Sequence, residues 1–138
     1  GQSVLMRGPY GRWTLDERSP HAVLISEGTG LTPFRSMCRY AIDRKLPLQL
    51  TILYSARTEE EQLYRLEYAQ WRRHGIDVHA MAGGRVDIGT IERKAPGLAA
   101  DFYLCGDSSF VKDLAATLNE RSVPRERIRY EKWGDYSF

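Results

Sequence analysis

Short apolar runs alternate with segments of helical spacing along most of this chain, and this alternation limits its fold more than any other feature. Five short segments lie between glycine, proline or charged turns, and most are apolar runs typical of buried strands, whereas 76–81 alternates apolar and polar residues. We expect these strands at 22–26, 48–56, 76–81, 101–105 and 127–132. Apolar residues repeat at helical spacing between them, which predicts helices over 32–46, 58–73, 88–94 and from 107 onward.

Capping residues indicate where the predicted helices begin and end. Thr32-Pro33 is typical of a helix start, with Thr32 as the N-cap. Thr58 with Glu61 three residues later matches a capping box, and Gly75 is the expected stop of that helix. Asp107 is expected to cap the last helix.

Strand–helix units that follow one another in this way predict an α/β fold, because right-handed crossovers place successive strands in parallel. We therefore expect a Rossmann-like three-layer sandwich with a five-stranded parallel sheet. A chain of 138 residues is the size of one such domain. Residues 1–20 contain glycine and proline and fit no strand–helix unit, so we expect them to lead into a domain at 21–138.

Charge and cysteine content argue against several classes of function. The formal net charge of +2 is too small for bulk attraction to nucleic acid or to a membrane surface. The apolar runs are far shorter than the roughly 20 residues that span a bilayer. Two cysteines without CxxC spacing are typical of a reducing, cytoplasmic setting. The histidines have no metal-ligand spacing, so we expect no metal site.

The carboxyl ends of parallel strands form the ligand-binding edge of such a sheet, and three segments with relevant chemistry fall there. The first is SEGTGLTP at 26–33. Gly28 and Gly30 permit a tight turn and close approach of a ligand, and the next helix offers unpaired N–H groups that suit a diphosphate. Taken alone, these residues fit a diphosphate site and a tight strand–helix turn without a ligand equally well.

The second segment is YSAR at 54–57, after the second strand. No acidic residue stands there to bind the adenosine ribose. We therefore expect Arg57 to contact either a 2′-phosphate or the ribose itself. The alternative is a solvated arginine at a helix start, where its charge is unfavourable beside the positive end of the helix dipole.

The third segment is LCGDSSF at 104–110, which places the Cys105 thiol at a strand end. The alternative is that Cys105 is simply a small buried residue. No histidine or lysine stands beside it in the sequence to lower its pKa, so we do not expect it to act as a nucleophile.

Together, these motifs resemble the C-terminal NAD(P)H-binding domain of the ferredoxin–NADP reductase-like flavoprotein reductases. That family has a GxG(I/L)xP turn, a CG turn with an apolar residue four positions after its glycine, and a C-terminal Glu followed by an aromatic residue. The matching residues here are Gly28, Gly30, Leu31 and Pro33, then Cys105, Gly106 and Phe110, then Glu131 and Trp133. The GPYG sequence at 8–11 is similar to the turn that closes the family's flavin-binding barrel.

The resemblance implies strand order 3-2-1-4-5 and binding of NAD(P)H for hydride transfer to FAD, which a domain outside this chain would mainly bind. It implies catalytic roles for Cys105 and Glu131, near the nicotinamide and the flavin, and places Arg57 and Arg85 at the adenosine end. The cofactor-binding residues that it implies are Gly28, Thr29, Gly30, Leu31, Pro33, Ser55, Arg57, Arg85, Cys105, Gly106, Asp107, Phe110 and Trp133.

Two departures from the family pattern matter. Glu27 stands where the family often has glycine, and we expect its side chain to point away from the diphosphate. The barrel's RxY(S/T) motif and the four cysteines of a [2Fe–2S] centre do not occur in this sequence. We therefore expect a longer reductase with a partner flavin domain and an unknown downstream electron acceptor, and no reductase activity of this domain unless flavin is supplied. Arg57 and Arg85 do not decide between NADH and NADPH.

The main alternative is a nucleotide-sensing Rossmann-like module without redox activity, which predicts ADP-ribose binding in a protein that has no flavin domain. A receiver domain is disfavoured because the acids that it needs at its strand ends are absent. The arginines at 121–129 are more typical of a solvated corner than of a nucleic-acid surface.

Overall fold

The computed structural model of the chain describes residues 1–8, 11, 13–95 and 97–133. Five strands of this described part form one sheet in the order β3-β2-β1-β4-β5, and all four neighbouring pairs are parallel. This confirms the predicted sheet and its order. The strands are β1 (His21–Glu27), β2 (Gln49–Ala56), β3 (Asp77–Ala82), β4 (Asp101–Asp107) and β5 (Ile128–Trp133).

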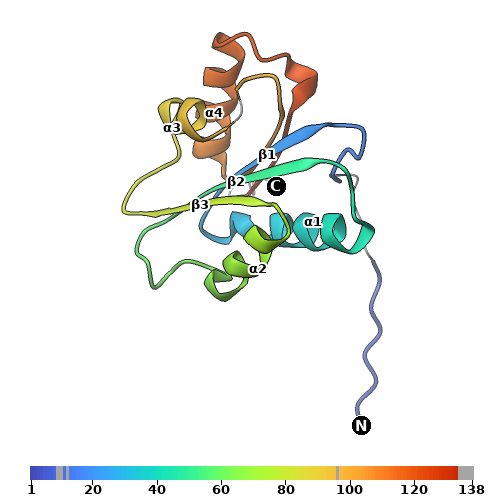
Figure 1. Cartoon of the computed structure of the whole chain (residues 1–138). Helices are drawn as coiled ribbons and strands as arrows, with labels where there is room; N and C mark the ends of the chain where they lie inside the picture. Colours follow the sequence, from blue (N-terminus) through green and yellow to red (C-terminus); the bar gives the residue numbers. More distant parts are fainter. Residues whose placement is uncertain (9–10, 12, 96, 134–138) are drawn as a thin grey trace.

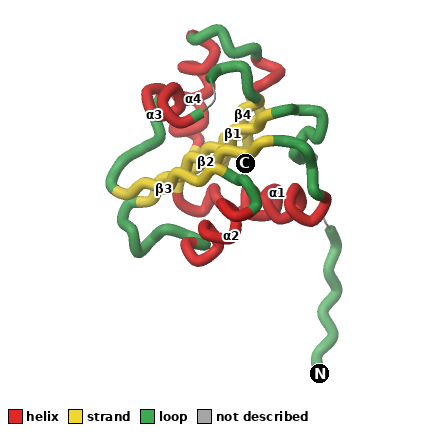
Figure 2. The backbone as a smooth tube through the Cα atoms, in the orientation of Figure 1, coloured by secondary structure: helices red, strands yellow, loops and turns green. Residues whose placement is uncertain are grey.

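Helices cover both faces of the sheet, as Figures 1 and 2 show. One face carries α1 (Leu31–Arg44) and α2 (Tyr68–Arg73), and the other carries α3 (Ile88–Lys94) and α4 (Ser108–Glu120). Each face has its own buried apolar cluster, one around Phe34 and Trp71 and the other around Phe102 and Leu118. Burial on both faces explains why the central strands β1, β2 and β4 are largely apolar runs, whereas the edge strands β3 and β5 also carry exposed polar residues.

The predicted helix over 58–73 is wrong in its first half. The chain there forms turns, then a 3₁₀ turn at Arg65–Glu67, and becomes α-helical only at Tyr68. The Thr58 hydroxyl does accept the Glu61 N–H at 3.3 Å, but it caps a turn and not a helix. Tyr64 adopts a left-handed backbone with φ of 55°, which an α-helix cannot contain.

Thr32 is not the N-cap of α1. A 3₁₀ turn at Gly28–Gly30 runs directly into the helix, so Gly30 takes the cap position without a side-chain hydrogen bond, and Thr32 is already helical. The other two predicted boundary residues are confirmed. Asp107 Oδ1 accepts the Phe110 N–H at 2.8 Å, and Gly75 follows α2 with φ of 82°.

Two parts of the N-terminal segment differ in their packing. Residues 1–8 extend away from the domain in Figure 1, and Pro9 and Tyr10 of the GPYG turn lie outside the described residues. Trp13 packs at 5.6 Å from Phe34 and 6.1 Å from Tyr103, measured between ring centroids. The Asp16 N–H donates to the Tyr103 hydroxyl at 2.8 Å, which fixes the segment to β4.

Candidate functional site

A cleft of about 560 Å³ opens at the edge of the sheet where the strands have their carboxyl ends. The chain turns from β1 toward β2 on one side, and β4 lies on the other side, so the cleft is at the switch point where parallel α/β sheets bind ligands. The fold therefore brings parts of all three predicted segments to one cleft. Its lining residues are Glu27, Gly28, Ser55, Ala56, Arg57, Gly83, Gly84, Arg85 and Asp107.

The glycine turn borders the cleft through Gly28. Gly28 has φ of 51°, a left-handed conformation that favours glycine, and no atom lies within 4 Å of the point where a Cβ would stand. Thr29 is exposed, whereas Gly30 and Leu31 are buried. No acidic residue lies in the first turn of α1 and no side chain caps it, so the positive end of the helix is open to an anion. Pro33 lies in that turn, where its missing N–H has little effect.

Arg85 lies at the centre of a charged cluster beside this turn. Its Nε is 3.1 Å from Glu27 Oε2, and its Nη2 is 3.0 Å from Asp107 Oδ2. The guanidinium also lies over the Phe110 ring, 5.8 Å from its centroid. Arg85 therefore links the ends of β1 and β4 and does not project toward β2.

Glu27 lines the cleft, and its carboxylate is paired with Arg85. Its side chain is only 18 % exposed, because Arg85 holds the carboxylate between the strands. Burial, followed by a hydrogen bond with Asp107, raises the pKa of Glu27, and the charge of Arg85 lowers it in part. The sequence offered no signal for this arrangement, because Arg85 is 58 residues away along the chain.

Arg57 and Ser55 occupy the end of β2. Ser55 is buried, whereas the Arg57 side chain is 90 % exposed and its Nε lies 3.2 Å from Glu61 Oε2. Gly83 and Gly84, at the end of β3, face the same opening and have no atom within 4 Å of a Cβ position. The β2–β3 side of the cleft therefore has open space and one exposed cation.

The start of α4 closes the other side of the cleft. The Asp107 carboxylate accepts hydrogen bonds from the Phe110 N–H at 2.8 Å and from the Ser109 hydroxyl at 2.7 Å, which hold its pKa at about 2. Gly106 is buried, and a Cβ there would lie 2.6 Å from Phe110 Cδ1 and 3.1 Å from Glu27 Cγ. Only glycine fits at position 106 without a shift of its neighbours.

Cys105 and Glu131 lie outside the cleft, on the face of the sheet that α1 covers. Cys105 packs in the apolar cluster around Phe34 and is register partner of Glu131 in β5. Burial, and then the charge of Glu131, raises the pKa of Cys105 to about 12. The raised pKa keeps the thiol protonated near neutral pH. Trp133 ends β5 and is register partner of Asp107.

Tyr64 contacts the start of α1, a neighbour relationship that the sequence did not indicate. Its hydroxyl lies 3.4 Å from the Thr32 hydroxyl, and its ring lies under the Arg35 guanidinium, 4.8 Å from ring centroid to Cζ. Arg35 in turn forms an ion pair with Glu67 at 2.8 Å. The helix expected over 58–73 does not predict this contact, because Tyr64 has a left-handed backbone with φ of 55°.

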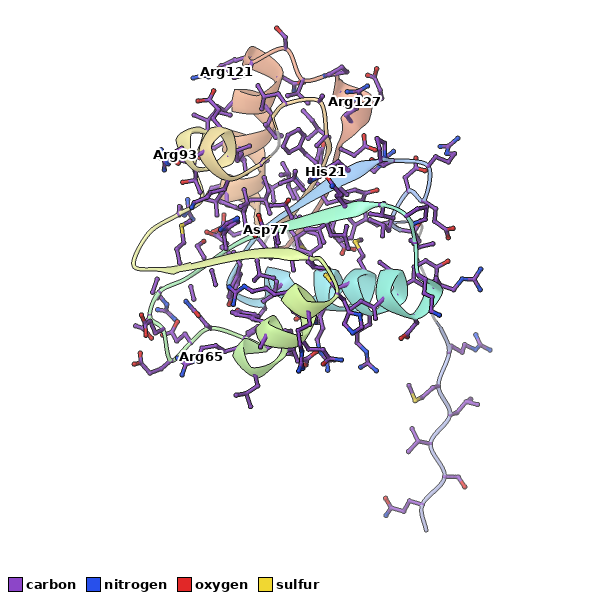
Figure 3. All side chains as sticks on the ribbon, in the orientation of Figure 1. His21, Arg65, Asp77, Arg93, Arg121 and Arg127 are labelled. Carbon is purple, nitrogen blue, oxygen red and sulfur yellow. The ribbon has the colours of Figure 1, made fainter. Side chains whose placement is uncertain are left out.

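Outside the cleft, the described residues include a second charged cluster, in which Arg129 pairs with Asp16 and Asp101. The ranges 1–8, 13–95 and 97–133 contain no group of three metal-ligating side chains and no helix long and apolar enough to cross a membrane. Arg121 and Arg127, labelled in Figure 3, are engaged within the domain. Arg121 pairs with Glu92, and Arg127 donates to the Ala99 carbonyl at 3.0 Å.

Comparisons with known proteins agree on the kind of domain. The family model described as "Oxidoreductase NAD-binding domain" matches residues 24–116. The chain is 26 % identical over 152 residues to a flavohemoprotein of Bacillus subtilis (strain 168), with 97 % of this chain covered. It is 28 % identical over 155 residues to ferredoxin–NADP reductase B of Sorangium cellulosum, with 96 % covered.

The fold comparison agrees with the sequence comparison. The FAD/NAD binding domain of nitric oxide dioxygenase from Vibrio cholerae superposes with a TM-score of 0.77, at 22 % identity, over 91 % of this chain and 56 % of that one. The chain spans 38 % of the flavohemoprotein's length and 63 % of the reductase's. It is therefore similar to one part of these longer proteins.

Proposed function

Because the chain belongs to the oxidoreductase NAD-binding domain family, we propose that it positions NAD(P)H for hydride transfer to FAD in a longer flavoprotein reductase. The family match also confirms the resemblance inferred from the motifs. The observation that best supports the proposal is the cleft at the switch point, where the glycine turn at 28–30 leads into an uncapped helix start.

The coenzyme would lie across the carboxyl edge with its diphosphate at the glycine turn. Gly28, Thr29, Gly30, Leu31 and Pro33 would shape the diphosphate site. The open space beside Gly83 and Gly84 supports placement of the adenosine half over β2 and β3, near Ser55 and Arg57. The nicotinamide would then extend to the β4–β5 side, where Cys105, Gly106, Asp107, Phe110 and Trp133 stand.

The chain's own residues would orient the nicotinamide and exclude water. The Cys105 thiol stays protonated and buried, so we assign it a packing and positioning role beside the nicotinamide. Glu131 is exposed next to it and would face the flavin. A bound FAD would accept the nicotinamide's hydride and release electrons one at a time, so the cofactors carry the chemistry.

The flavin domain is the partner that this proposal requires. Residues 1–20 would lead in from its barrel, with 21–138 as the NAD(P)H-binding domain. Three consecutive apolar side chains support this, because Val4, Leu5 and Met6 are 81 %, 92 % and 87 % exposed in the extended segment. The downstream electron acceptor would bind elsewhere in the protein. Cys38 and Cys105 are both unpaired, which supports a reducing, cytoplasmic setting.

Calorimetric titration of the chain with ADP-ribose tests the proposal, because this ligand carries the adenosine and diphosphate without the nicotinamide. We expect binding, and we expect Gly28→Ala to weaken it about tenfold or more. Gly75→Ala is the matched control, since Gly75 also has positive φ and open space but lies far from the cleft. No binding at millimolar ligand, or equal effects of the two substitutions, would argue against the proposal.

A further inference from the structure

Both guanidinium groups that line the cleft are already paired with carboxylates. Arg57 pairs with Glu61, and Arg85 pairs with both Glu27 and Asp107. The charged side chains among the cleft's described lining residues therefore sum to zero, and Glu61 beside them adds one negative charge. A site built to hold a phosphate monoester has the opposite balance, with cationic donors in excess.

We infer that this site selects NADH over NADPH, an inference that rests on the proposed function. The two coenzymes differ only in the 2′-phosphate of the adenosine ribose, which carries close to two negative charges at neutral pH. Entry of that group into a cleft without surplus positive charge is unfavourable, whereas the ribose hydroxyls of NADH carry no charge.

Arg85 is poorly placed to turn toward a 2′-phosphate. Its two carboxylate partners are neighbours of each other, and Glu27 is mostly buried. If Arg85 left, two adjacent carboxylates would lose the cation between them and repel each other. The raised pKa of Glu27, which burial and Asp107 cause, is consistent with this strain on its charge.

Among the described lining residues, Arg57 is the more exposed cation and the freer to turn. Its side chain is 90 % exposed, and exposed ion pairs such as Arg57–Glu61 are weak. Even so, Glu61 would stay close to a phosphate that Arg57 binds. The end of β3 adds no side-chain donor, because Gly83 and Gly84 stand there. Glu61 is therefore the residue through which we expect the discrimination to be adjustable.

Calorimetric titration of the chain at low salt with ADP-ribose and with 2′-phospho-ADP-ribose tests the inference. The expected result is weaker binding of the phosphorylated ligand. Equal or tighter binding of that ligand would overturn the inference and leave the proposed function intact. Failure of both ligands to bind at millimolar concentration would overturn the proposed function, and the inference with it.

A pair of variants tests the role of Glu61. Glu61→Gln releases Arg57 and should tighten binding of 2′-phospho-ADP-ribose severalfold while changing ADP-ribose binding little. Glu59→Gln is the control, since it removes the same charge from the same exposed turn without a pair to Arg57. Equal effects of the two variants would show that Glu61 acts through general charge alone and would overturn its assignment as a specificity-determining residue.

Discussion

Cys105 and Glu131 are register partners on neighbouring parallel strands, and the carboxylate adds to burial in raising the pKa of the thiol to about 12. The pair joins a buried group to an exposed one at the carboxyl edge of the sheet. The pKa of the Cys105 thiol should therefore change when the charge at position 131 is removed.

The first prediction concerns alkylation of Cys105 by iodoacetamide, resolved by peptide mass spectrometry. Because the thiolate is the reactive form, we expect the native chain at pH 8 to react at least about 100-fold more slowly at Cys105 than the unfolded chain. Glu131→Gln should raise the native rate, since removal of the charge lowers the pKa. Cys38, whose pKa burial alone raises to about 12, is the internal control and should not change. An unchanged rate at Cys105 would show that Glu131 does not influence the thiol.

The second prediction is that Gly106→Ala destabilises the domain. The added methyl group would overlap Phe110 and crowd Glu27, and overpacking of this kind costs about 1–3 kcal/mol. Urea unfolding measures the loss. Gly84→Ala, which meets no atom within 4 Å, should stay within about 0.5 kcal/mol of the unaltered chain. Similar losses in both variants would contradict the steric explanation.

The third prediction concerns the Asp107 cap of α4. Asp107→Ala should lower the free energy of unfolding by about 1 kcal/mol, whereas Asp107→Asn keeps an acceptor for the Phe110 N–H and should cost less. The pKa of Asp107 is lowered to about 2 in the folded chain, below its ordinary value of 3.8. Ionisation of this carboxylate therefore stabilises the fold above about pH 4, and the effect disappears as the pH falls toward 2.

Unfolding measured between pH 2 and pH 6 checks that sign. The stability difference between the unaltered chain and Asp107→Asn should shrink as the pH falls through this window. A difference that is constant with pH would mean that the charge of Asp107 has no part in its capping role.

The fourth prediction concerns the hydrogen bonds that fix the N-terminal segment to β4. Tyr103→Phe removes the hydroxyl that accepts from the Asp16 N–H at 2.8 Å and from Arg129 at 3.1 Å, at a cost of about 1–2 kcal/mol. Hydrogen exchange at the Asp16 amide should accelerate by about tenfold or more. Tyr130→Phe, at a half-exposed ring on β5, is the control and should leave that amide protected.

The fifth prediction is that the flavin-free chain does not oxidise NADH with ferricyanide. Hydride leaves the nicotinamide with two electrons and ferricyanide accepts one, so the cofactor that links the two steps is required. Turnover is followed by absorbance with and without added FAD. Rapid turnover without flavin would contradict the proposal that electron transfer needs FAD bound mainly by another domain.

Local sequence carries most of the fold because the central strands are buried on both faces and stand out as apolar runs. The runs at 22–26 and 101–105 are continuous, and the structure places strands over both. The segment 58–73 was mispredicted because its conformation depends on distant groups. The Tyr54 hydroxyl accepts the Leu63 N–H at 3.3 Å, and Thr32 lies against Tyr64, so tertiary contacts override helix propensity there.

The candidate site was predictable in its backbone but not in its ion pairs. Gly28 and Gly106 could be identified because turns and close contacts restrict those positions to glycine. The pairing of Arg85 with Glu27 and Asp107 depends on which strand ends become neighbours and on where long side chains turn. No local pattern encodes that choice.

The strand order also has a consequence for the chain as the ribosome releases it. β1 needs β4 on one side, and residues 28–100 must be made before β4 begins. During that interval a strand that is apolar on both faces has one open edge, the kind of surface that pairs with other chains. The contacts from Tyr103 and Arg129 to Asp16 form later still. We therefore expect the nascent chain to be most prone to pairing with other chains just before its fourth strand emerges.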